Sequence, residues 1–254
     1  MSGKAELNAV FARKIAHRGF HDSRSGVIEN TSAAFSAALA GGYGMECDIQ
    51  PSADGEAMVF HDFTLDRLTH TQGRVDRLNA TDLKAVRFRQ GSGAMQSLDD
   101  LLTQISGREP LVIELKSRFD GNTRIATRVA ALVADYAGPL VLKSFDPAMI
   151  VALRDAGVKQ PLGVVGMGII SYEYPDFGVL TAGQKHELAN LLHFGQSRPD
   201  FLSWHHGDLA SAVPYLCRTG IGMPLMSWTI RSQADADLAR PHIDQIVFEG
   251  FSPA

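Results

Sequence analysis

Cysteine is scarce in this 254-residue chain, which contains two, Cys47 and Cys217, far apart in the sequence. Such a pair provides neither a disulfide framework nor a thiolate metal site, so it favours a reducing compartment. Positive charge is not in excess either, since the formal net charge is -4 and the pI is near 6.1. This balance argues against a nucleic-acid-binding protein that relies on a general basic field.

Long hydrophobic runs are also absent. No apolar segment approaches the roughly 18 residues that a membrane-spanning helix needs, so no integral membrane segment is predicted. Residues 1–19 lack the apolar core and the small-residue cleavage site of a signal peptide. Together with the scarcity of cysteine, this predicts a cytoplasmic protein. No repeat or low-complexity segment divides the chain, and we expect residues 1–254 to form a single domain.

Short apolar segments alternate with segments of helical periodicity along the chain. Eight of them resemble buried strands: 14–19, 43–50, 110–116, 139–145, 160–166, 199–204, 224–230 and 244–250. Such alternation is typical of an α/β fold with a parallel sheet covered by helices. Eight units in one chain of this length match a (β/α)8 TIM barrel. The pattern alone leaves a doubly wound open sheet as the alternative.

Residues 63 to about 96 interrupt this rhythm. They follow a predicted extra strand at 56–62 and are polar, rich in turn residues and only weakly helical around 81–86. We interpret them as an insertion after the second strand, over one end of the barrel. Elsewhere, helix starts are predicted by Ser97 with Asp100, by Ser232 with Asp235, and by Asp146 before a proline.

The stretch YGMECDIQ, residues 43–50, places Glu46 and Asp48 two positions apart in an otherwise apolar segment. Alternate residues of a strand point to the same face, so both carboxylates share one face while Cys47 points to the other and is predicted to pack in the core. Two buried carboxylates are costly unless a cation or a proton relieves them. On their own they could equally be the solvated face of an edge strand.

The carboxyl ends of the predicted strands supply possible partners for these carboxylates. In a barrel these ends form the active site, and here they carry ionisable residues: His17, Arg18, Glu46, Asp48, His61, Glu114 and Lys116. Three carboxylates without a nearby thiolate suit Mg²⁺ or Ca²⁺, with Mn²⁺ possible. Arginine and lysine suit a phosphate, and two histidines suit an acid and a base near neutral pH. The combination indicates metal-assisted phosphoryl-ester chemistry.

The order of short motifs resembles that of the glycerophosphodiester phosphodiesterase family. They run from IAHRG near residue 17 to FEGF near residue 250 and include HRG, ENT, ECDIQ, HD, LDRLT and IELK. The resemblance implies a TIM barrel with a small insertion after the second strand. It also implies the hydrolysis of glycerophosphodiesters to glycerol 3-phosphate and an alcohol with a divalent cation, and a place in lipid and glycerol metabolism.

Residue roles follow from the same resemblance. It implies that His17 and His61 are the general acid–base pair, that Arg18 and Lys116 contact phosphate, and that the metal ligands are Glu46, Asp48 and Glu114. The hypothetical mechanism is attack of the glycerol 2-hydroxyl on phosphorus, with one histidine taking the proton and the other protonating the leaving alcohol. Water then opens the cyclic phosphate with these roles reversed.

Other residues near the strand ends have open interpretations. The resemblance implies that Trp228 is a pocket wall, although core packing is an equal alternative. Asn30 is predicted to be a helix N-cap rather than a substrate contact, and Asp62 to orient His61. Lys143 could line the pocket or lie on the surface. At the ends of later strands, at most one of His205 and His206 can face the site, and Glu249 stands where relatives in the resembled family commonly carry another motif.

Two other functions compete with the leading hypothesis. One is a phospholipase D-like relative that acts on lysophospholipid or sphingolipid head groups, but such relatives tend to be secreted, to have disulfides and to lack the insertion. The other is a barrel that binds phosphorylated metabolites without turnover, which would be expected to have lost a histidine or a metal carboxylate. The sequence indicates neither the preferred alcohol nor the oligomeric state.

Overall fold

A computed structural model describes residues 3–91, 93–174 and 177–254, so residue 92 of the predicted insertion lies outside the described part. All nine predicted strands are present, and their bounds are β1 Ile15–Ala16, β2 Gly44–Pro51, β3 Ala57–Val59, β4 Leu111–Leu115, β5 Leu140–Ser144, β6 Leu162–Gly166, β7 Phe201–His205, β8 Leu225–Ile230 and β9 Gln245–Phe248. The strand prediction is therefore confirmed, with shorter elements than the apolar segments suggested.

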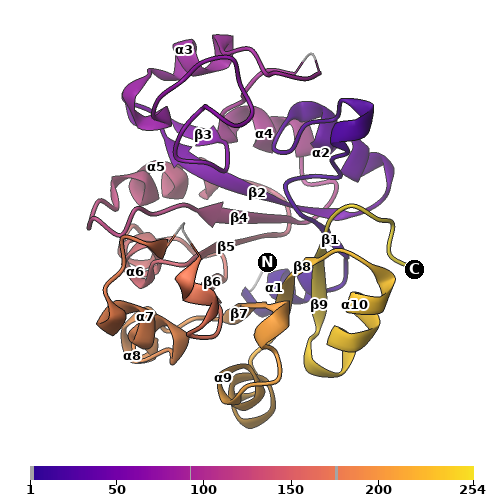
Figure 1. The fold of residues 1–254 in the computed structure, drawn as a ribbon, viewed down its shortest axis with the longest axis vertical. Coiled ribbons are helices and arrows are strands. Elements are labelled where there is room, and N and C mark those ends of the chain that lie inside the picture. Colours follow the sequence, from indigo (N-terminus) through magenta and orange to yellow (C-terminus); the bar gives the residue numbers. More distant parts are fainter. Residues whose placement is uncertain (1–2, 92, 175–176) are drawn as a thin grey trace.

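Eight strands close into a parallel barrel, so the TIM barrel is confirmed and the open sheet is excluded (Figure 1). The order is β1, β2, β4, β5, β6, β7, β8 and β9, and β1 pairs with both β2 and β9. β1 contributes only two residues, so the far end of β2 is free to pair with the antiparallel β3 through Ile49 and Val59. This extra strand carries the chain into the insertion.

The barrel is surrounded by helices that connect successive strands (Figure 1). Their bounds are α1 Gly3–Phe11, α2 Ser32–Ala40, α3 Ala80–Ala85, α4 Leu98–Ile105, α5 Arg124–Val133, α6 Pro147–Asp155, α7 Ala182–Ala189, α8 Phe194–Ser197, α9 Ala212–Tyr215 and α10 Gln233–Ala239. The predicted caps are present, since Ser97 and Asp100 form a capping box, Asp146 caps α6, and Ser232 accepts from Asp235.

Side-chain alternation divides each barrel strand between two cores. On β2, Met45, Cys47 and Ile49 point outward into the main core beneath the helices, as the sequence pattern predicts. Inward-facing apolar side chains fill the opposite end of the barrel, where α1 closes the barrel with Leu7 and Val10. The barrel interior is therefore apolar at one end and carries the ionisable side chains at the other.

The insertion has a small apolar core of its own. Met58 and Phe60 from the β3 segment pack with insertion residues such as Leu65, Leu83 and Phe88. Its short helix α3 lies close to the weakly helical segment predicted at 81–86. Within the described ranges, no helix combines the length and hydrophobicity that a membrane crossing requires.

Candidate active site

The HRG motif follows β1 and forms a tight turn at the mouth of the barrel. Arg18 and Gly19 both have positive φ, 55° and 77°. A Cβ atom on Gly19 would lie 2.8 Å from the backbone of Ala34, so the position requires glycine in both conformation and space. The turn aims the Arg18 backbone N–H at Glu46 Oε2, 3.2 Å away, and so joins β1 to the carboxylates of β2.

Glu46, Asp48 and Glu114 converge inside the barrel. Each offers a carboxylate oxygen that lies within 4.8 Å of the other two, and all three side chains are buried. The register explains the meeting, because Asp48 on β2 is directly opposite Glu114 on β4. The sequence analysis expected these three side chains to gather, and the fold brings them together.

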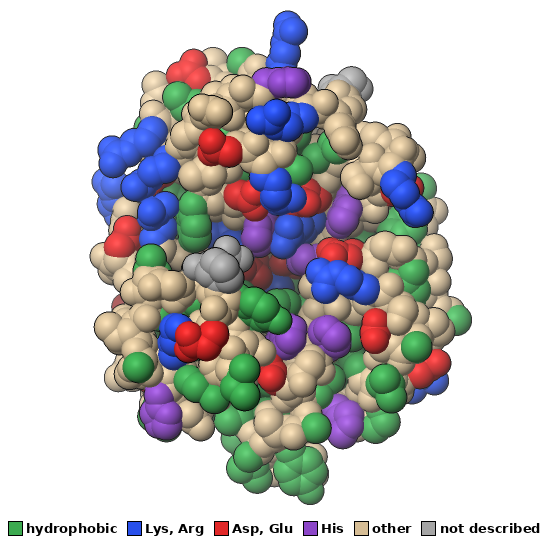
Figure 2. Space-filling view, in the orientation of Figure 1, with side chains coloured by type: hydrophobic (Ala, Val, Ile, Leu, Met, Phe, Trp, Pro, Cys, Tyr) green, Lys and Arg blue, Asp and Glu red, His purple; other side chains and the backbone are tan. Residues whose placement is uncertain are grey.

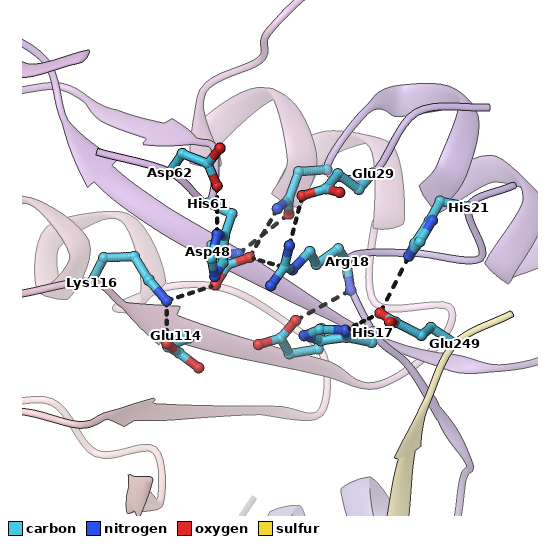
Figure 3. Close-up of polar contacts among 12 residues, drawn as sticks. His17, Arg18, His21, Glu29, Asp48, His61, Asp62, Glu114, Lys116 and Glu249 are labelled. Atoms are coloured by element: carbon cyan, nitrogen blue, oxygen red, sulfur yellow. Dashed lines mark hydrogen bonds and ion pairs between the residues drawn. The ribbon is translucent and has the colours of Figure 1, made fainter. Parts of the chain in front are cut away.

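Neighbouring cations keep Asp48 and Glu114 ionised. Lys116 Nζ lies 2.9 Å from Glu114 Oε1 and 3.6 Å from Asp48 Oδ1, while Arg18 Nε is 3.4 Å from Asp48 Oδ2 (Figure 3). Burial alone raises the pKa of Asp48, but the charges of His61, Lys116 and Arg18 outweigh it and hold this pKa well below the usual range. Burial likewise raises the pKa of Glu114, but the charges of Lys116 and Lys143 outweigh it and lower this pKa.

Asn30 is not a helix N-cap, so that prediction was wrong. Thr31 occupies the N-cap position of α2, and Asn30 adopts a left-handed backbone conformation one residue earlier. Its buried side chain donates from Nδ2 to Asp48 Oδ2 at 2.9 Å and accepts from the Asp48 backbone at 3.3 Å. Asn30 therefore fixes the orientation of the Asp48 carboxylate, which a capping pattern in the sequence could not reveal.

Lys143 is the main residue that the sequence analysis left unplaced, and it does not lie on the surface. It is 2% exposed and sits on β5 opposite Glu114, with Nζ 3.1 Å from Glu46 Oε1 and 3.3 Å from Glu114 Oε2. Burial opposes a positive charge, but Glu46 and Glu114 outweigh it and raise the Lys143 pKa. The sequence contains one signal for this placement, which is that the lysine lies within a predicted buried strand.

The carboxylate cluster fits a hard divalent cation. All three donors are carboxylate oxygens, which Mg²⁺, Ca²⁺ and Mn²⁺ prefer. Glu46 Oε1 is also buried and accepts no hydrogen bond of good geometry from the described residues. Among the described residues, the only cation close to this oxygen is the Lys143 ammonium group, at 3.1 Å, and a bound cation would satisfy it more fully.

His61 is held by its neighbour Asp62. Nδ1 of His61 lies 2.8 Å from Asp62 Oδ1, as predicted, and Gln50 donates to the His61 carbonyl at 2.7 Å. Because Nδ1 is directed at the carboxylate, Nε2 is the ring nitrogen that remains available for proton transfer. Burial and the charge of Lys116 together lower the His61 pKa despite the nearby carboxylates, which favours the neutral imidazole.

His17 is held by Glu249 from the opposite end of the sequence. Nδ1 of His17 lies 2.5 Å from Glu249 Oε2, and the same carboxylate also lies close to His21 (Figure 3). Arg231 contacts its other oxygen. Burial raises the Glu249 pKa, but the hydrogen bond with His17 and the nearby His21 and Arg231 outweigh it and keep the carboxyl ionised. The sequence analysis noted Glu249 as a departure from the family pattern, and its contact explains what it does.

Arg67 ties the insertion to both sides of the site. Its guanidinium donates to Glu29 at 2.7 and 3.0 Å and to Asp62 at 2.6 and 2.8 Å. Glu29 in turn accepts from Arg18 at 2.7 Å. Burial alone raises the Glu29 pKa, but Arg67 and Arg18 outweigh it and bring the pKa to about 2. One arginine thus braces the residues beside His61 and beside the phosphate-binding candidate Arg18.

One cavity of about 770 Å³ lies at the carboxyl ends of the strands, and its lining includes His17, Arg18, Asp48, His61, Glu114, Lys116 and Lys143. Figure 2 shows basic, acidic and histidine side chains gathered around a hollow at the centre of this face. Its other wall is aromatic, because Phe145 packs 5.0 Å from Phe177 and 5.4 Å from Trp228 between ring centroids. Trp228 therefore lines the cavity, and so does His205 but not His206.

Known proteins share both this sequence pattern and this fold. The model of the Glycerophosphoryl diester phosphodiesterase family matches residues 17–168. A glycerophosphodiester phosphodiesterase from Caldanaerobacter subterraneus subsp. tengcongensis is 37% identical over 163 residues, which span 60% of this chain and 65% of that protein, slightly under two thirds. A protein of the same name from Bacillus altitudinis is 33% identical over 211 residues, covering 79% of this chain and 84% of its own length.

Solved structures show the same fold at lower identity. A putative glycerophosphoryl diester phosphodiesterase from Silicibacter pomeroyi is 20% identical and superposes with a TM-score of 0.74 over 96% of this chain and 93% of that one. An Oleispira antarctica phosphodiesterase in complex with the product sn-glycerol-3-phosphate is 21% identical, with a TM-score of 0.70 over 92% and 91% of the two chains. With the family model matching more than half of its length, the chain belongs to the glycerophosphoryl diester phosphodiesterase family.

Proposed function

We propose that this protein is a metal-dependent phosphodiesterase that hydrolyses glycerophosphodiesters to glycerol 3-phosphate and an alcohol. The observation that carries the proposal is the single cavity in which two histidines, a carboxylate cluster and two phosphate-binding candidates meet. The names of the curated relatives and the product bound to the Oleispira antarctica structure support this choice of substrate.

The metal would be held by Glu46, Asp48 and Glu114, with Asn30 orienting Asp48. A bound divalent cation polarises a phosphoryl oxygen and lowers the pKa of a hydroxyl group that it contacts. The oxygen-only donor set supports Mg²⁺, Ca²⁺ or Mn²⁺ without choosing between them. Arg18 and Lys116, which line the same cavity, would bind the remaining phosphate oxygens.

The two histidines have environments suited to opposite roles. Neutral His61 would take the proton of the glycerol 2-hydroxyl through Nε2 as that oxygen bonds to phosphorus. His17, which Glu249 orients through Nδ1, would protonate the alcohol oxygen as its bond to phosphorus breaks. In the second half, His17 would take a proton from the water that adds to phosphorus, and His61 would protonate the glycerol 2-oxygen as its bond to phosphorus breaks, which restores both histidines to their starting states.

The aromatic wall would receive the uncharged part of the substrate. Trp228 and Phe145 meet nearly edge to face beside the charged half of the cavity, and His205 packs 5.3 Å from Trp228. Packing of the substrate's apolar carbon atoms against these aromatic rings would add binding free energy without competing for the groups that contact phosphate. This placement supports a substrate-binding role for Trp228.

The single-domain organisation and the cytoplasmic location stay predictions.

The proposed reaction can be tested by a coupled assay for glycerol 3-phosphate with several head groups, with and without EDTA. We expect product from glycerophosphodiesters, a fall of at least about 100-fold on chelation, and recovery when Mg²⁺, Ca²⁺ or Mn²⁺ is added back. Chromatography of the products from a lysophospholipid tests the phospholipase D-like alternative. Activity that EDTA leaves unchanged would contradict the metal-dependent mechanism.

Replacing Glu249 by glutamine should lower turnover at least about tenfold, because the amide no longer fixes the tautomer and orientation of His17. The conservative Glu249→Asp variant is expected to retain more activity, since it keeps a carboxylate near Nδ1. Steady-state kinetics of both variants check this, with thermal unfolding as the control for folding. Equal kcat in the wild type and Glu249→Gln would show that this contact does not support the reaction.

A further inference from the structure

Lys143 occupies the position where a metal ion would meet two of its proposed ligands. Its ammonium group lies 3.1 Å from Glu46 Oε1 and 3.3 Å from Glu114 Oε2, and both oxygens face the interior of the barrel. Glu46 Oε1 is the buried oxygen that has no well-formed hydrogen bond. Lys143 and a divalent cation would therefore compete for the same pair of oxygens.

The cluster is also electrically balanced by the chain itself. Its three carboxylates are matched by three cations, Lys143, Lys116 and Arg18, each within 3.6 Å of a carboxylate oxygen. All three cations line the cavity where phosphate is proposed to bind, but Lys143 lies deepest among the carboxylates and is only 2% exposed. Carboxylates that are already paired with cations gain less from an added cation than unpaired carboxylates would.

We propose that Lys143 is a resident counter-cation of the carboxylate cluster, which a divalent metal must displace from Glu46 and Glu114 and which keeps metal affinity low. This inference rests on the metal site of the proposed function. The proposal predicts that removing the Lys143 charge strengthens metal binding. A lysine that merely held the carboxylates in place would weaken metal binding when removed.

Isothermal titration of the purified protein with MnCl₂, and in parallel with MgCl₂ and CaCl₂, tests the proposal without reference to turnover. We expect Lys143→Gln to bind Mn²⁺ at least about tenfold more tightly than the wild type, because a nearby positive charge is gone. Lys143→Arg keeps the charge and should stay close to the wild type. Lys84→Gln removes a lysine that pairs with Asp100 outside the cavity and should change nothing.

Thermal unfolding gives a second measure of metal binding, which is independent of calorimetry. Without metal, Lys143→Gln leaves buried negative charge uncompensated, so its Tm should fall below that of the wild type. Added Mn²⁺ should raise its Tm by more than it raises the wild-type Tm, because the ion binds only the folded state. A variant that folds only with metal would support the proposal by the same coupling.

Two outcomes overturn the inference and separate it from the proposed function. Equal or weaker Mn²⁺ binding by Lys143→Gln, with a native circular dichroism spectrum, would show that Lys143 does not compete with the ion. In that case the metal site itself stands. Absence of metal binding by the wild type, Lys143→Gln and Lys143→Arg alike would overturn the metal site, and the inference with it.

Discussion

Replacing His61 by alanine is expected to lower turnover at least about 100-fold, and replacing His17 should do the same. Both imidazoles line the cavity and each is held through Nδ1 by a carboxylate, which leaves Nε2 for proton transfer. The backbone hydrogen bonds that hold the barrel strands together do not involve these two side chains, so the variants should fold. Initial rates of glycerol 3-phosphate release at saturating substrate would measure the loss.

A suitable control for these variants is His70→Ala. His70 lies in the insertion that follows His61, but it is exposed and lies outside the cavity lining. Its loss should leave kcat within about twofold of the wild type, as for most surface substitutions. Full activity in both His17→Ala and His61→Ala would contradict the acid–base assignment, even if the protein still bound substrate.

Replacing Asp48 by asparagine should abolish metal binding and turnover together. The amide retains the shape of the side chain but loses the negative charge between Arg18, Lys116 and Asn30. We expect at least about a 100-fold loss of kcat and a matching loss of Mn²⁺ affinity, measured by calorimetry on the same preparation. Glu46→Gln should behave in the same way.

Asp135→Asn provides the matched control, because Asp135 is exposed after α5 and remote from the cavity. Circular dichroism and thermal unfolding of all three variants separate a lost ligand from a lost fold. If Asp48→Asn unfolds, the carboxylates belong to the structural network of the barrel. If it folds and still binds Mn²⁺ as tightly as the wild type, Asp48 is not a ligand.

Most of the fold could be predicted because its signals are local. Each barrel strand is a short apolar segment bounded by turn residues, and the capping patterns at Ser97 and Asp146 mark where helices begin. The site residues of the HRG, ECD, HD and IELK motifs were also predictable, since strand ends in a barrel must meet. Alternation along β2 alone was enough to separate Cys47, in the core, from the two carboxylates beside it.

The residues that escaped prediction act through contacts distant in sequence. Lys143 meets Glu46 because β5 lies two strands from β2, and Glu249 meets His17 across 232 positions of the chain. Asn30 was misassigned because the same residue type caps helices and binds carboxylates, and only the register of the following helix distinguishes the two. Local patterns place a residue on an element, but pairings between elements decide what it does.

Arg67 has a consequence for how this site can change over time. The guanidinium holds Glu29 and Asp62 on either side, so the insertion and the loop after β1 are joined through one side chain. Substitution of Arg67 alone would leave two carboxylates facing each other near Arg18 and His61. The insertion is therefore not a module that can be exchanged freely among barrels of this kind; positions 29, 62 and 67 are expected to evolve as a set.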